Sequence, residues 1–160
     1  MSENRPAPTA HVSTKELGDT EGLNGLELMQ AMRDGRVPPP PIGETLNFVL
    51  TEVDEGVAVF EADARADFYN PLGMVHGGWA ATLLDSCMGC AVHTTMEPGG
   101  RYTTLEIKIN YIRAISSETG RLRAEGQVVH RGRRTATAEG RLVDAAGKLY
   151  AHGTTTCIIL

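Results

Sequence analysis

The chain lacks the features that mark membrane, secreted and disulfide-bonded proteins. No run of consecutive apolar residues is longer than four, whereas a membrane-spanning helix needs about 20. The first twenty residues are polar and contain no apolar core of the kind that a secretion signal has. The three cysteines have no framework of spacings and are typical of reduced thiols. We therefore expect a cytoplasmic protein that does not bind membranes.

Several catalytic motifs are also absent. None of the five serines has glycines at both −2 and +2, which excludes the nucleophile elbow of α/β-hydrolases. There is no phosphate loop, no G-x-G-x-x-G and no H-E-x-x-H, and the five histidines never pair at metal-binding spacing. Cys87 and Cys90 have redox or zinc spacing, but they lie inside an expected helix and no second pair exists. We expect no metal and interpret both cysteines as small apolar core residues.

The charge that is present is distributed unevenly. Residues 1–100 hold 5 basic and 15 acidic side chains, whereas residues 101–148 hold 10 basic and 5 acidic ones. This balance argues against a uniformly basic nucleic-acid-binding domain, so no nucleic-acid partner is expected. It is compatible with a local cationic patch that meets a phosphate-bearing small molecule. The candidate patch is the run Arg131, Arg133 and Arg134.

Composition and periodicity together predict one globular α+β domain behind an N-terminal arm. A hydrophobic content of 41% with 22% charged residues excludes disorder throughout the chain. Residues 1 to about 22 lack periodicity, a short helix is expected over 23–34, and the prolines of 38–41 favour an extended segment. The domain boundaries are therefore 1–39 for the arm and short helix, and 40–160 for the main domain.

The main domain has one long helical stretch, expected over 77–96. Strand-like patterns occupy six ranges, namely 45–53, 57–63, 102–113, 120–130, 134–144 and 148–159. The junctions 116–120, 131–133 and 145–147 are short enough for antiparallel hairpins. An antiparallel sheet wrapped around the one long central helix, with a short extra N-terminal helix, satisfies this order.

The start of the long helix offers candidate chemistry. Gly77 and Gly78 leave backbone N–H groups uncovered beside the positive end of the helix dipole, where an anion or a developing oxyanion can bind. Asp85 has only small or apolar neighbours three and four positions away, and a carboxylate desolvated on such a face is a candidate general base. A lone Asp in a helix is more commonly a surface residue, and paired glycines more commonly mark a turn.

The spacing of these two groups constrains the site. Asp85 follows Gly77 by eight residues, which is ~12 Å along one helix axis. Both groups therefore contact one carbonyl only if Gly77 of one chain meets Asp85 of another. This arrangement predicts an active site at a two-fold dimer interface, with two sites per dimer.

The motif resembles that of a known family. Asn70, Gly73, His76-Gly77-Gly78 and Asp85, nine residues after the histidine, are similar to the signature of hotdog-fold acyl-CoA thioesterases of the phenylacetate-degradation (PaaI-like) type. The resemblance covers roughly residues 40–160. It implies an acyl-CoA substrate, hydrolysis to the free acid and CoA, and no cofactor, because coenzyme A is part of the substrate.

The resemblance also implies roles for individual residues. The residue matching Asp85 is the base or nucleophile, and the amide matching Gly77 polarises the thioester carbonyl. Asn70 and His76 shape the oxyanion and water sites, and Thr104 helps to position water. The turn matching Arg131, Arg133 and Arg134 contacts the phosphates of coenzyme A, and Met74, Trp79 and Met88 are candidates for the acyl pocket.

Several alternatives remain open at this point. Asn70 is also explained as a turn residue beside Pro71, and Arg134 as a solvated strand residue. A non-catalytic acyl-CoA-binding or regulatory hotdog module, or a hotdog dehydratase or hydratase, are the alternative functions. The sequence does not distinguish a base from a nucleophile at Asp85, and it does not identify the acyl group. We expect a homodimer and, above it, a dimer of dimers.

Overall fold

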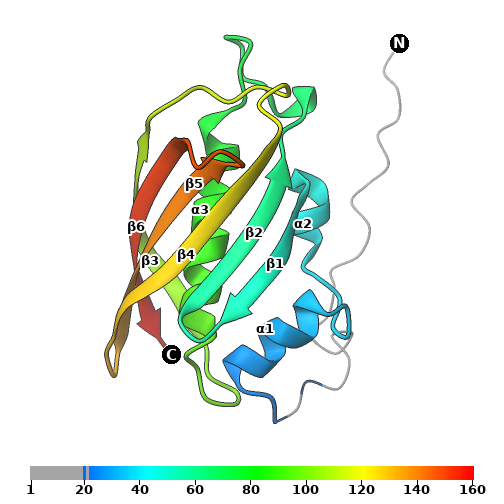
Figure 1. Cartoon of the computed structure of the whole chain (residues 1–160). Helices are drawn as coiled ribbons and strands as arrows, with labels where there is room; N and C mark the ends of the chain where they lie inside the picture. Colours follow the sequence, from blue (N-terminus) through cyan, green and yellow to red (C-terminus); the bar gives the residue numbers. More distant parts are fainter. Residues whose placement is uncertain (1–19, 21) are drawn as a thin grey trace, which may run out of the picture.

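The computed structural model describes Thr20 and residues 22–160, so most of the expected N-terminal arm lies outside the described residues. The helices are α1 (Gly25–Arg33), α2 (Pro41–Leu46), the short 3-10 helix η2 (Ala66–Phe68) and α3 (Gly77–His93). The strands are β1 (Phe48–Asp54), β2 (Val57–Asp63), β3 (Tyr102–Tyr111), β4 (Arg121–Arg131), β5 (Thr135–Asp144) and β6 (Leu149–Ile159) (Figure 1).

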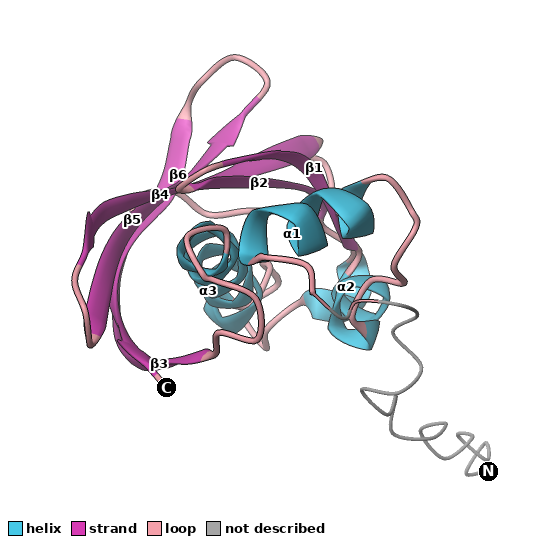
Figure 2. Ribbon diagram, turned by 90° about the horizontal axis from the view of Figure 1, so that it is seen from below, coloured by secondary structure: helices cyan, strands magenta, loops and turns pink. Residues whose placement is uncertain are grey.

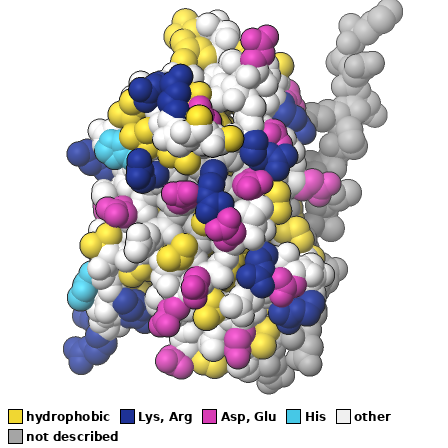
Figure 3. Space-filling view, viewed as in Figure 1, with side chains coloured by type: hydrophobic (Ala, Val, Ile, Leu, Met, Phe, Trp, Pro, Cys, Tyr) yellow, Lys and Arg dark blue, Asp and Glu magenta, His cyan; other side chains and the backbone are white. Residues whose placement is uncertain are grey.

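The six strands form one antiparallel sheet in the order β1-β2-β4-β5-β6-β3. The sheet curls around α3, which lies on its concave side, and α1 and α2 lie beside α3 below β1 and β2 (Figure 2). The opposite, convex face shows basic and acidic side chains interspersed (Figure 3). This arrangement confirms the expected fold, an antiparallel sheet around one long helix with a short extra helix before it.

Glycines in register form a row across β4, β5 and β6, and two of them let α3 lie close against the centre of the sheet. Gly126 pairs with Gly140, which pairs with Gly153 on the next strand. A Cβ atom added to Gly126 would lie 2.3 Å from the backbone of Cys87. Interior spaces this tight admit no extra carbon, so Gly126 and Gly140 of this glycine row set how closely α3 approaches the sheet.

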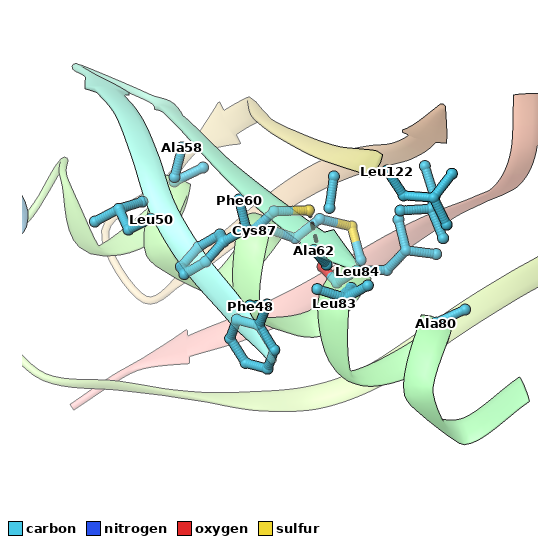
Figure 4. Close-up of a cluster of buried hydrophobic side chains, with 14 of the residues drawn as sticks. Phe48, Leu50, Ala58, Phe60, Ala62, Ala80, Leu83, Leu84, Cys87 and Leu122 are labelled. Atoms are coloured by element: carbon cyan, nitrogen blue, oxygen red, sulfur yellow. Dashed lines mark hydrogen bonds between the residues drawn. The ribbon is translucent and has the colours of Figure 1, made fainter. Parts of the chain in front are cut away.

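The core between α3 and the sheet is mainly apolar. Leu83, Leu84 and Cys87 of α3 are fully buried against Phe60 and Leu122 of the sheet (Figure 4). The Cys87 thiol donates a hydrogen bond to the Leu84 carbonyl at 3.3 Å, and burial raises the pKa of this thiol. Cys87 is thus the small core residue that the sequence predicts.

Cys90 is half-buried and free, and burial, followed by the charge of Asp85, raises the pKa of its thiol to about 12.

In the described part of the chain, no helix has the length and apolarity that a membrane crossing requires.

Two local predictions are wrong. The junction 116–120 is not a hairpin, because β3 pairs with β6 at the edge of the sheet, and the chain from β3 crosses over to β4. The proline segment is extended only through Pro40, and Pro41 begins the short helix α2. A proline at the first helical position has no amide that needs a partner, so it starts a helix as readily as it ends one. The expected order of the remaining elements is confirmed.

Candidate active site

The loop before α3 is held by side-chain caps. His76 is the N-cap of α3, and its Nδ1 accepts a hydrogen bond from the Gly78 N–H at 2.8 Å. Asn70 Oδ1 accepts the amides of Leu72 at 2.9 Å and Met74 at 3.3 Å, which makes it the turn-forming residue of this loop. Both side chains therefore shape the loop that leads into α3.

Gly77 is the first residue of α3, and its N–H donates no hydrogen bond within the described residues. An uncapped amide at a helix N-terminus carries the positive partial charge of the dipole. The geometry therefore leaves the Gly77 N–H as a donor that can serve a ligand.

Asp85 lies at the middle of α3 and is exposed in the single chain. The hydroxyl of Thr104 on β3 donates a hydrogen bond to Asp85 Oδ1 at 3.0 Å. The desolvated environment that the sequence suggests for this carboxylate is therefore not present within one chain. The structure does bring Thr104 and Asp85 together, although they are 19 residues apart.

Strand β3 also contacts α3 on either side of this hydrogen bond. The Tyr111 hydroxyl donates to the Gly77 carbonyl at 3.1 Å, and the Tyr102 ring lies over Gly89. A Cβ atom at residue 77 would lie 3.2 Å from the Tyr111 ring, so the glycine makes room for the tyrosine. Tyr111 belongs to no motif that would mark it as a site residue, and its only signal in the sequence is its position on the apolar face of an alternating strand.

Two cavities flank the first turn of α3. One, of about 300 Å³, is lined by Met74, Gly77, Ala80 and the segment 111–115. The other, of about 380 Å³, lies on the opposite side of His76 and includes Trp79, whose Nε1 donates to the Leu46 carbonyl at 2.8 Å. Met74 and Trp79 therefore each border a cavity beside the loop.

Met88, the third residue expected in the acyl pocket, is fully buried. It lies between α3 and the sheet, where a Cβ atom added to Gly140 would be 2.9 Å from its Cγ. Within one chain this side chain is a core residue.

The arginine cluster lies in the β4–β5 turn, at the end of α3 remote from Gly77 (Figure 1). Arg131 is exposed, and its guanidinium donates to the Gly132 carbonyl and to Met96 Sδ, the latter at 3.7 Å. The side chains of Arg133 and Arg134 are exposed and make no hydrogen bond or salt bridge within the described part of the chain. These two side chains are free to meet an anionic ligand.

Known proteins share this sequence pattern and this fold. The family model of the thioesterase superfamily matches residues 72–151. A 1,4-dihydroxy-2-naphthoyl-CoA hydrolase from Escherichia coli is 29% identical over 136 residues, which are 84% of this chain and 94% of that protein.

Two solved structures extend the comparison. A phenylacetic acid degradation-related protein from Ralstonia eutropha is 32% identical, with a TM-score of 0.74 over 81% of this chain and 98% of that one. A mutant of the phenylacetic acid degradation protein PaaI from Thermus thermophilus is also 32% identical, with a TM-score of 0.68 over 76% of this chain and 100% of that one.

Proposed function

The chain belongs to the thioesterase superfamily, as a PaaI-like thioester hydrolase with the hotdog fold, and from this premise we propose how its site works. It hydrolyses an acyl- or aryl-CoA to the free acid and CoA. Asp85 is the general base or the nucleophile, and the Gly77 amide is the oxyanion donor. The observation that carries the proposal is that one edge strand, β3, hydrogen-bonds both to Asp85, through Thr104, and to Gly77, through Tyr111.

These groups suffice for thioester hydrolysis by either of two routes. In the first, Asp85 takes a proton from water, the water oxygen attacks the carbonyl carbon, and the Gly77 N–H stabilises the oxyanion. Collapse of this intermediate breaks the C–S bond and releases CoA, whose sulfur takes up the proton that Asp85 accepted from water. In the second, the Asp85 carboxylate attacks directly, CoA leaves, and water hydrolyses the mixed anhydride.

A single chain cannot bring the two groups to one carbonyl. Gly77 and Asp85 lie on the same straight helix, ~12 Å apart along its axis. An antiparallel α3 of a second copy would place each Gly77 beside the partner's Asp85 if the two-fold axis passed near Ala81. The face of α3 turned away from the sheet permits this approach because Gly78 and Ala81 are small.

The same two-fold axis would also cover the exposed edge of the sheet, which is formed by β3. Among the described strands β3 pairs only with β6, and its apolar side chains Leu105 and Tyr111 are 57% and 55% exposed. An exposed apolar edge is a liability that pairing removes. Antiparallel pairing of two β3 strands centred near Ile107 would set Tyr111 of one chain close to the partner's Thr104. A homodimer built in this way completes two sites, and a dimer of dimers remains a prediction.

The remaining residues bind the substrate. Arg131, Arg133 and Arg134 meet the phosphates of coenzyme A. The cavity beside Gly77 receives the acyl group, with Met74 and Ala80 in its wall. Its lining is largely apolar, which suits an aliphatic or an aromatic acyl group.

Release of free thiol from a panel of aliphatic and aromatic acyl-CoA thioesters tests the function. We expect catalytic turnover of at least one substrate, with CoA and free acid formed in equal amounts. Binding of acyl-CoA without thiol release would instead indicate a regulatory module. Conversion of an enoyl- or 3-hydroxyacyl-CoA without thiol release would indicate a dehydratase or hydratase.

A further inference from the structure

We propose that Tyr111 is a positioning residue for the oxyanion donor, because it holds the first turn of α3 so that the Gly77 N–H stays directed at the substrate. This inference rests on the proposed function, in which the Gly77 amide binds the thioester oxygen. Tyr111 touches Gly77 rather than the reacting atoms, so it acts through the backbone.

The peptide unit between Gly77 and Gly78 is held at both ends. Its carbonyl oxygen, on Gly77, accepts the hydrogen bond from the Tyr111 hydroxyl at 3.1 Å. Its N–H, on Gly78, donates to His76 Nδ1 at 2.8 Å. The strand and the N-cap therefore fix one peptide plane from opposite sides, and the preceding N–H, that of Gly77, is left unpaired within the described residues.

Two adjacent glycines need such a restraint more than other residues do. Glycine has no Cβ atom and samples more backbone conformations than any other residue, so a Gly-Gly start leaves the first turn of a helix loose. The Tyr111 ring lies where the missing side chain of Gly77 would be, 3.2 Å from the Cβ position. An oxyanion donor works best when its direction is set before the reaction begins, because no reorganisation is then needed in the transition state.

Through strand β3, Tyr111 also links the Gly77 donor to Asp85, the other catalytic group of the proposed site. Tyr111 and Thr104 belong to the same strand, and each donates one hydrogen bond to α3. Pairing of β3 with a second copy would therefore order the Gly77 turn as well as the Asp85 carboxylate. Tyr111 is 55% exposed in the single chain, and such pairing would cover it.

Tyr111→Phe tests the inference because it removes the hydroxyl and keeps the ring. We expect kcat to fall about three- to tenfold with KM changed less than about twofold, since a hydrogen bond of ordinary strength then no longer orients the donor in the transition state. Tyr111→Ala also removes the ring, and kcat should fall further, by about ten- to a hundredfold. Tyr111→Phe should therefore retain part of the activity that Tyr111→Ala loses.

Tyr150→Phe is the matched control. The Tyr150 hydroxyl also donates one hydrogen bond, to Asp144 Oδ2 at 3.3 Å, next to the β5–β6 turn. Its loss should leave kcat within about twofold of the unmodified protein. Amide hydrogen exchange gives a readout that does not depend on activity, and exchange at Gly78 should be faster in Tyr111→Phe than in Tyr150→Phe.

The outcomes separate this inference from the proposed function. A protein that cleaves thioesters but shows unmodified kcat and unmodified Gly78 exchange in Tyr111→Phe would overturn the role of Tyr111 alone. Equal losses of kcat in Tyr111→Phe and Tyr150→Phe would also overturn it, because the effect would then be one of general stability. If the unmodified protein cleaves no thioester, the proposed function fails, and the exchange rates alone decide whether Tyr111 restrains the turn.

Discussion

Replacing Asp85 by Asn removes one proton acceptor and changes little else. The side chain is exposed, and an amide oxygen can still accept the hydrogen bond that Thr104 donates at 3.0 Å. We therefore expect the free energy of unfolding to change by less than ~0.5 kcal/mol, as for other surface substitutions. Turnover should fall at least about a hundredfold, because an amide neither takes a proton from water nor attacks a carbonyl, and general-base catalysis alone contributes a factor of about 10² to 10⁴.

Thr104→Val removes the donor of the same hydrogen bond and should cause a smaller loss of activity. It keeps the volume of the side chain and leaves the carboxylate in place but unoriented. The hydrogen bond is partly exposed and worth ~1 kcal/mol, so kcat should fall about fivefold. The order of activity is therefore unmodified protein, then Thr104→Val, then Asp85→Asn.

The assay is thiol release under saturating substrate, with thermal unfolding measured in parallel. Asp54→Asn is the matched control, because Asp54 is an exposed carboxylate at the end of β1 that accepts a hydrogen bond from the Glu55 amide at 2.8 Å. It should retain full activity. If Asp85→Asn turned over a good substrate at nearly the unmodified rate, Asp85 would be neither base nor nucleophile.

Two further predictions concern substrate affinity and packing. Changing Arg133 and Arg134 together to Ala should raise KM for CoA thioesters about tenfold in a salt-sensitive way, because contacts with the phosphates are lost. KM for a short thioester without the nucleotide should change little, and so should KM for CoA thioesters in the control variant Arg36→Ala. Equal effects on both substrates would assign these arginines to a solvated turn. Gly126→Ala should lower the free energy of unfolding by more than ~3 kcal/mol, beyond the usual overpacking cost, because its Cβ would lie 2.3 Å from the Cys87 backbone. Gly140→Ala should lower it less, because its Cβ would meet the flexible Met88 side chain at 2.9 Å. Equal unfolding midpoints of the two variants would contradict this view of the glycine row.

The parts of the fold that the sequence predicts are those governed by local patterns. Alternation of apolar residues identifies the strands, and helical spacing with a glycine start identifies α3. Strand pairing is a long-range property, so the short junction at 116–120 suggested a hairpin although β3 crosses to the far edge beside β6. The proline run concealed α2 because proline is compatible with an extended segment and with the first position of a helix.

The candidate site likewise has residues that the sequence identifies and residues that only the fold brings together. Gly77, His76 and Asp85 belong to one continuous motif, and their spacing is readable along the chain. Tyr111 contacts Gly77 across 34 residues, and only the folded sheet brings the two together. The exposure of Asp85 in one chain has the same origin, because the surface proposed to cover it belongs to a second copy.

Mixing two inactive variants tests the shared site most directly. Gly77→Pro removes the donor N–H, and the backbone tolerates proline there, since the preceding His76 is extended at φ −61° and ψ 133° and residue 77 is the first of the helix. Gly77→Ala, which keeps the N–H, controls for the contact with Tyr111. Subunit exchange between Gly77→Pro and Asp85→Asn should restore activity, because each mixed dimer has one site with both lesions and one with neither. Verified heterodimers that remain inactive, or a fully active monomer, would contradict a site built from two chains.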